Sequence, residues 1–95
     1  MLEDVLRTLR AELPELARGY NIQSLGVFGS IVRGVQRSRS DVDILVEFQR
    51  TPTFFEFIEL EDRLAELLGA KVDLVMRSAL KPRIGDRILA EVVNV

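Results

Sequence analysis

Residues 41–48, which read DVDILVEF, constrain the fold more than any other segment. Polar and apolar residues alternate at its start, and the side chains of a strand point alternately to the two faces of a sheet. The segment is therefore expected to form a strand that buries Val42 and Ile44 in the core. Asp41 and Asp43 then project together from the opposite face, with their Cα atoms about 7 Å apart.

Helical and strand patterns alternate along the rest of the chain. Apolar residues at steps of three and four predict helices near residues 2–17, 54–68 and 80–92. Pro14 is expected to kink the first of these helices or to start a new one. Strands are predicted at 22–28 and 71–76, a short helix at 30–35 and a polar loop at 36–40. This order indicates an α/β (α+β) fold, a small sheet flanked by helices, in a single domain spanning residues 1–95.

Composition excludes several kinds of chemistry. The chain has neither cysteine nor histidine, which excludes disulfides, the usual zinc sites and Ser-His-Asp triads. No apolar run approaches the roughly 20 residues that cross a bilayer, and the charged N-terminal residues do not fit a signal peptide. The formal net charge of −2 gives no general footprint for nucleic acid. We therefore expect a soluble, cytoplasmic protein that uses carboxylates, lysine, tyrosine or hydroxyls.

Three aspartates are candidate catalytic and metal-binding residues. Asp41 and Asp43 repel each other, and a divalent cation relieves that repulsion. Asp73, in the run KVDLVM, joins them on one face if its strand neighbours theirs. Such an all-oxygen set suits Mg²⁺, and three acids suit two ions about 4 Å apart. Asp73 is then a shared ligand or the base that takes the acceptor's proton. The alternatives are solvated acids at 41 and 43, and an ion pair between Asp73 and Lys71.

Gly29, Ser30 and Arg33 are candidate nucleotide-binding residues. A glycine between a strand and a short helix lets a ligand approach the backbone, and the first N–H groups of the helix point at a bound anion. Ser30 can contact a phosphate or simply cap the helix. Arg33 lies one turn further on the same face. Arg37 and Arg39 add positive charge nearby, although a solvated loop is the simpler interpretation of these two.

The spacing of these residues resembles that of the nucleotidyltransferases of the DNA polymerase beta superfamily. The shared pattern is Gly29-Ser30, ten intervening residues, Asp41-x-Asp43, and Asp73 on a later strand. The phrases LGVFGSIVRG, SDVDILVEF and LKPRIGDRILAEVV are similar to the minimal nucleotidyltransferases, or MNT proteins, over essentially the whole chain. The resemblance implies a mixed sheet with flanking helices and Mg²⁺ held by the three aspartates. It also implies that Gly29 and Ser30 hold the phosphates of a nucleotide.

The resemblance further implies an activity and a partner. MNT proteins are commonly antitoxins of toxin–antitoxin pairs whose toxins are all-helical HEPN ribonucleases. The implied reaction transfers AMP from ATP to a tyrosine of the toxin, and without a further acceptor-binding domain a protein surface is the expected acceptor. Two alternatives stay open. One is an antitoxin that acts by contact with a vestigial metal site. The other is a transferase for a small molecule or an RNA end, aided by a partner chain. No membrane partner and no direct nucleic-acid binding are expected, and an oligomer is compatible with the sequence.

Overall fold

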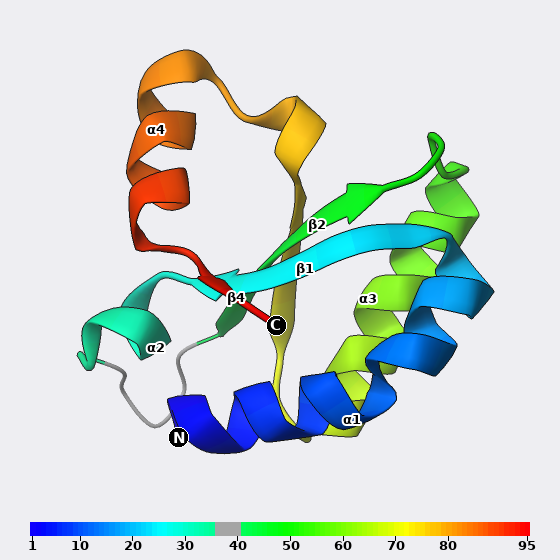
Figure 1. Cartoon of the computed structure of the whole chain (residues 1–95), viewed down its shortest axis with the longest axis horizontal. Helices are drawn as coiled ribbons and strands as arrows, with labels where there is room; N and C mark the ends of the chain where they lie inside the picture. Colours follow the sequence, from blue (N-terminus) through cyan, green and yellow to red (C-terminus); the bar gives the residue numbers. More distant parts are fainter. Residues whose placement is uncertain (36–40) are drawn as a thin grey trace.

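The computed structural model describes residues 1–35 and 41–95 as a four-stranded sheet with flanking helices (Figure 1). The predicted loop at 36–40, with Arg37 and Arg39, lies outside these residues. No helix in the two described ranges has both the length and the hydropathy that a membrane span requires. In chain order the elements are α1 (Leu2–Tyr20), β1 (Ile22–Phe28), α2 (Ser30–Arg33), β2 (Val42–Phe48), α3 (Phe54–Leu68), β3 (Val72–Met76), the 3-10 turn η1 (Arg77–Ala79), α4 (Pro82–Glu91) and β4 (Val93–Asn94).

The sheet is mixed, with strand order β3-β2-β1-β4. β2 and β3 are parallel, whereas β1 is antiparallel to both β2 and β4. The expectation of a small mixed sheet is therefore confirmed. β4 was not predicted, because a strand of two residues is too short to show a periodic pattern. It pairs with β1 at Gly26 and Val27 and ties the C-terminal segment to the edge of the sheet.

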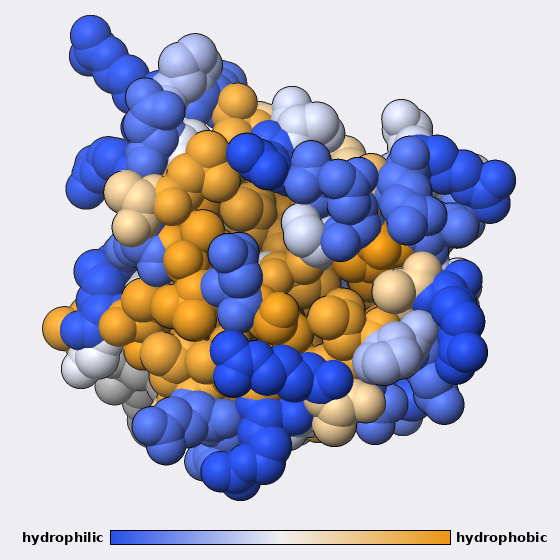
Figure 2. Space-filling model, in the orientation of Figure 1, coloured by the Kyte–Doolittle hydropathy of each residue, from blue (hydrophilic) through white to orange (hydrophobic). Residues whose placement is uncertain are grey.

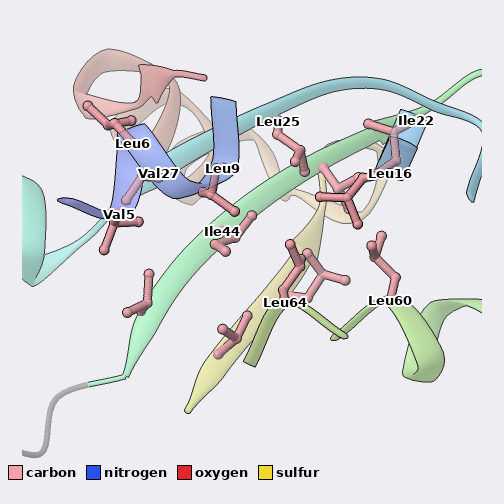
Figure 3. Packing of buried hydrophobic residues seen from close by; sticks show 14 of the residues in the cluster. Val5, Leu6, Leu9, Leu16, Ile22, Leu25, Val27, Ile44, Leu60 and Leu64 are labelled. Atoms are coloured by element: carbon pink, nitrogen blue, oxygen red, sulfur yellow. The ribbon is translucent and has the colours of Figure 1, made fainter. Parts of the chain in front are cut away.

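One face of the sheet carries the hydrophobic core (Figure 3). Val42, Ile44 and Val46 of β2 are fully buried, as their alternation predicts. They join leucines of the two helices that cover this face, among them Leu9 of α1 and Leu64 of α3. α3 is further fixed at its start by a capping box, in which Thr53 and Glu56 exchange side-chain-to-backbone hydrogen bonds. Because this face is filled, polar side chains of the strands must emerge on the other face.

α1 continues through Pro14 without interruption, so the expectation of a new helix beginning there is wrong. Proline has no backbone N–H to donate to the carbonyl one turn earlier. It therefore destabilises a helix by the loss of one hydrogen bond and by steric strain. Leu9 and Leu16, on either side of Pro14, are both buried in the core, so both halves of α1 pack against the sheet. The helix ends at Tyr20, and Asn21 in a left-handed conformation (φ 55°) is its C-cap.

α4 is far less buried than α1 and α3. It spans Pro82–Glu91, within the predicted range of 80–92, and ends at Glu91 because Val92 takes an extended conformation that leads into β4. Its one buried residue is Gly85, while Ile84 is 59% exposed and Leu89 40% exposed. In Figure 1 the strands run between α4 and the pair formed by α1 and α3. Figure 2 shows apolar side chains gathered in the middle of this view and beside α4, surrounded by hydrophilic ones. The second face of the sheet is thus only partly covered.

Candidate active site

Asp43 and Asp73 lie opposite each other on the neighbouring parallel strands β2 and β3. Asp43 is half-buried and Asp73 is exposed, and Asp41 stands immediately before β2. Burial raises the pKa of the Asp43 carboxyl above its ordinary value, and the negative charges of Asp73 and then Asp41 raise it further. The structure therefore brings the three predicted aspartates to one end of the sheet.

Lys71 pairs with Asp41 and not with Asp73. The Lys71 Nζ lies 4.0 Å from Asp41 Oδ2. The backbone N–H of Val42 donates to the backbone carbonyl of Lys71. The alternative in which Asp73 pairs with Lys71 is therefore wrong. Parallel pairing sets Lys71 beside Asp41, because Val72 lies opposite Val42. The lysine side chain is 82% exposed, so solvent screens this pair strongly.

Gly29 is required by the position of Asp43. Its φ is +83°, a backbone conformation that side chains disfavour. A Cβ atom at this position would collide with Asp43 Oδ2. The collision follows from strand pairing, because Phe28 is the partner of Asp43 in the register of β1 and β2. The glycine thus lets a carboxylate, as well as a prospective ligand, approach the backbone.

Ser30 is the first residue of α2 and not its cap. Gly29 takes the N-cap position, and no side-chain hydrogen bond caps this helix among the residues described. The interpretation of Ser30 as a helix cap is therefore wrong, because that position is already occupied by a residue without a side chain. Ser30 is half-buried beside Gly29, and its predicted contact with a phosphate stays a prediction.

Arg33 contacts Glu91, a residue that sequence reasoning missed. The Arg33 Nη1 atom lies 3.1 Å and 3.0 Å from the two carboxylate oxygens of Glu91. The backbone N–H of Gly29 donates to the same carboxylate at 3.1 Å. One signal could have identified it: Ile84, Ile88 and Glu91 follow helical spacing, so an acid extends an apolar stripe of α4.

These side chains open onto a groove between α4 and the start of β2. Its volume is about 430 Å³. The residues that line it are Phe28, Gly29, Arg33, Asp43, Ile84, Arg87, Ile88 and Glu91. A larger groove of about 510 Å³ lies at the other end of β2 and is lined by residues 46–52 and 76–78. None of the three aspartates lines it, so the smaller groove is the better candidate for the site.

The carboxylates fit Mg²⁺ by the chemistry of the donor set. Within residues 1–35 and 41–95 no three side chains form a ready-made metal cage. Mg²⁺ does not need one, because it commonly takes one or two carboxylates and completes its shell with waters and substrate phosphates. Burial is the main cause of the raised pKa of Asp43, and the negative charges of Asp73 and Asp41 add to it. A bound cation would relieve the repulsion among these charges.

Comparison with known proteins agrees with this geometry. The sequence model of the nucleotidyltransferase domain matches residues 6–94. Protein adenylyltransferase MntA of Thermococcus cleftensis is 49% identical over 94 residues, which cover 99% of this chain and 95% of that protein.

Two solved structures share the fold. One is of a protein proposed to be a minimal nucleotidyltransferase, with 34% identity, a TM-score of 0.81, and coverage of 97% of this chain and 94% of that chain. The other is a chain of a toxin–antitoxin complex with AMP-PNP, with 27% identity, a TM-score of 0.73, and coverage of 88% and 69%. With its aspartates at the start of β2 and on β3, and with a relative 49% identical over nearly its whole length, this chain belongs to the nucleotidyltransferase domain family.

Proposed function

We propose that this chain transfers AMP from ATP to a tyrosine of a HEPN-type toxin, with Mg²⁺ as cofactor. It would thereby act as the cytoplasmic antitoxin of a toxin–antitoxin pair. The observation that carries the proposal is the position of Asp43, which lies opposite Asp73 and against Gly29. Further support comes from the name of the relative MntA, a protein adenylyltransferase, and from the AMP-PNP in the toxin–antitoxin structure.

In this proposal Asp41 and Asp43 hold the metal, and Asp73 lies beside them as the base. When bound, Mg²⁺ supplies positive charge that neutralises the triphosphate and the acids. Asp43 is the central member, because burial raises its pKa and the charges of both other aspartates raise it further. The ionised form of Asp43 is disfavoured in the protein alone, so a nearby cation would stabilise the carboxylate.

Gly29, Ser30 and Arg33 bind the phosphates. The Gly29 N–H and the Arg33 guanidinium already converge on one carboxylate, that of Glu91, so they are placed to donate together to one anion. Ser30 adds a hydroxyl donor next to Gly29. The main-chain donor brings the phosphate close to the backbone, which the absence of a side chain at position 29 permits.

Asp73 is the base in the transfer step. The acceptor hydroxyl attacks the α-phosphorus of ATP, forms a new P–O bond and gives up its proton, while the bond to the bridging oxygen breaks and pyrophosphate leaves. Asp73 is exposed on β3, so it can meet a hydroxyl that a partner protein presents from outside. A base at this position is worth about 10²–10⁴ in rate.

The test combines the purified chain with the product of the adjacent reading frame, Mg²⁺ and ATP labelled at the α-phosphate. We expect label on a tyrosine of that partner and loss of its ribonuclease activity. The matched control is the double variant Asp41→Asn/Asp43→Asn, which should leave the partner unlabelled and active.

The same experiment separates the alternatives. Inhibition of the partner without label, and equally by the double variant, would establish an antitoxin that acts by contact. Label that appears on RNA or a small molecule instead of the partner would establish a different acceptor. Absence of label from every acceptor, under conditions where ATP binds, would contradict the proposed transfer.

A further inference from the structure

Glu91 holds two of the groups that the proposed function assigns to the triphosphate. Its Oε1 atom accepts from the backbone N–H of Gly29 at 3.1 Å, and Arg33 Nη1 lies 3.1 Å from Oε1 and 3.0 Å from Oε2. Glu91 comes from α4, 62 residues away from Gly29 in the sequence. A carboxylate therefore sits where these donors converge, as a phosphate oxygen would.

A carboxylate and a phosphate cannot both take the single N–H of Gly29, which already donates to Glu91. Arg33 contacts Glu91 through one nitrogen, and although its guanidinium carries further N–H donors, the Glu91 carboxylate already offsets part of its positive charge. The two anions would also repel each other at this distance. Phosphate binding at Gly29 and Arg33 therefore requires Glu91 to withdraw.

The surroundings of Glu91 allow such a withdrawal. Glu91 is the last residue of α4, whose one buried residue is Gly85. The Glu91 side chain is 25% exposed and that of Arg33 is 55% exposed, so their ion pair is partly screened by solvent. Arg87 lines the same groove one helical turn before Glu91, which places a second cation within reach of a rotated side chain.

We propose that Glu91 is an internal competitor of the nucleotide, whose carboxylate must leave Gly29 and Arg33 before the triphosphate can bind them. The inference rests on the proposed function, since it needs those two residues to be the phosphate donors. It makes Glu91 a determinant of nucleotide affinity. The carboxylate keeps both donors satisfied in the free protein and lowers the affinity for ATP below the value that the donors alone would give.

The test measures the dissociation constant of AMP-PNP, with Mg²⁺, by calorimetry on the full chain. Glu91→Gln removes the charge while it preserves the shape. We expect AMP-PNP to bind about fivefold more tightly to this variant, the factor that corresponds to one partly exposed ion pair. Glu47→Gln is the matched control, because Glu47 is 33% exposed and pairs with Arg77 at 3.3 Å at the far end of β2. Its affinity for AMP-PNP should equal that of the wild type.

A second variant guards against a loss of folding. Glu91→Asp keeps the charge but draws the carboxylate back from both donors, so it should also bind AMP-PNP more tightly than the wild type. Circular dichroism melting establishes that each variant is folded at the temperature of the titration. If only one of the two Glu91 variants is folded, the affinity of that variant for AMP-PNP decides the test.

The outcomes distinguish the inference from the proposed function. Unchanged or weaker AMP-PNP binding in the folded variants, with normal binding by the wild type, would overturn the inference and leave the proposed function intact. Glu91 would then position Gly29 and Arg33 for binding instead of competing. No binding by the wild type or by either variant would overturn both.

Discussion

The two ends of β2 each carry an acid on the same face of the sheet, but the charges around them differ. Near the end of the strand, Glu47 is paired with Arg77 at 3.3 Å and accepts from Ser24 Oγ at the same distance. At the start, burial raises the pKa of Asp43, and the negative charges of Asp73 and Asp41 each raise it by more than the positive charge of Arg33 lowers it. One end is balanced and the other holds an excess of negative charge.

This difference favours the Asp43 end of β2 as the candidate site, whereas the size of the grooves does not. The groove at the balanced end is the larger, about 510 Å³ against about 430 Å³. A paired acid on a strand contributes little beyond local structure. A carboxylate such as Asp43, whose pKa is raised by burial and by neighbouring acids, is ionised at some energetic cost, which is typical of sites where a cation or a proton is handled.

The largest expected effect is on the rate of AMP transfer, and it compares Asp43 with Glu47. Asp43→Asn should abolish measurable transfer of AMP, because the metal loses a charged ligand between the other two aspartates. Glu47→Gln, at the balanced end, should leave the initial rate unchanged. Initial rates of label transfer to the partner protein provide the measurement. Equal losses in the two variants would show that the excess of charge at the start of β2 has no special role.

Substitution of Asp73 should slow the transfer of AMP without weakening the binding of the nucleotide. Asp73→Asn is expected to lower the rate of transfer about 10²–10⁴-fold, the usual contribution of a general base. The affinity for AMP-PNP should stay close to that of the wild type, because Asp41 and Asp43 remain to hold the metal. Single-turnover rates and calorimetric titration measure the two quantities. A wild-type rate in this variant would reduce Asp73 to an ordinary exposed residue of β3.

Two glycines test how closely Asp43 is packed. Gly34 has a φ of +74° and open space around it, so Gly34→Ala should cost only about 1–2 kcal/mol for the backbone conformation. Gly29 has a similar φ of +83°, but a Cβ there meets the Asp43 carboxylate. Gly29→Ala should therefore lower the free energy of unfolding in urea by at least about 1 kcal/mol more than Gly34→Ala. Similar losses would mean that Asp43 moves aside easily.

The smallest expected effect concerns pH. The folded protein raises the pKa of Asp43 above its ordinary value of 3.8, so the folded state binds this proton more tightly than the unfolded state does. The stability that the residue contributes is present below that value and is lost as the pH rises through the folded pKa. Without metal, Asp43→Asn should therefore gain melting temperature relative to the wild type between about pH 3 and about pH 7. A constant difference across that range would contradict the raised pKa.

The sequence by itself determined the features that depend on local periodicity and local backbone chemistry. The alternation in DVDILVEF was enough to bury Val42 and Ile44 and to turn Asp43 to the other face, because the period of a strand does not depend on its neighbours. The glycine before a short helix was recognisable for a similar reason. Pro14 shows the limit of such reasoning: its effect on α1 was decided by buried contacts on both sides of it.

Only the tertiary structure decided which distant residues meet. The register of β2 and β3 set Asp73 opposite Asp43 and placed Lys71 where it pairs with Asp41. The register of β1 and β2 pressed the Asp43 carboxylate against Gly29. Glu91 reached Gly29 and Arg33 because β4 pairs with β1 and anchors the end of α4 beside them. A pattern along the chain records which face a residue occupies, but a contact between distant segments depends on how whole elements pair and pack.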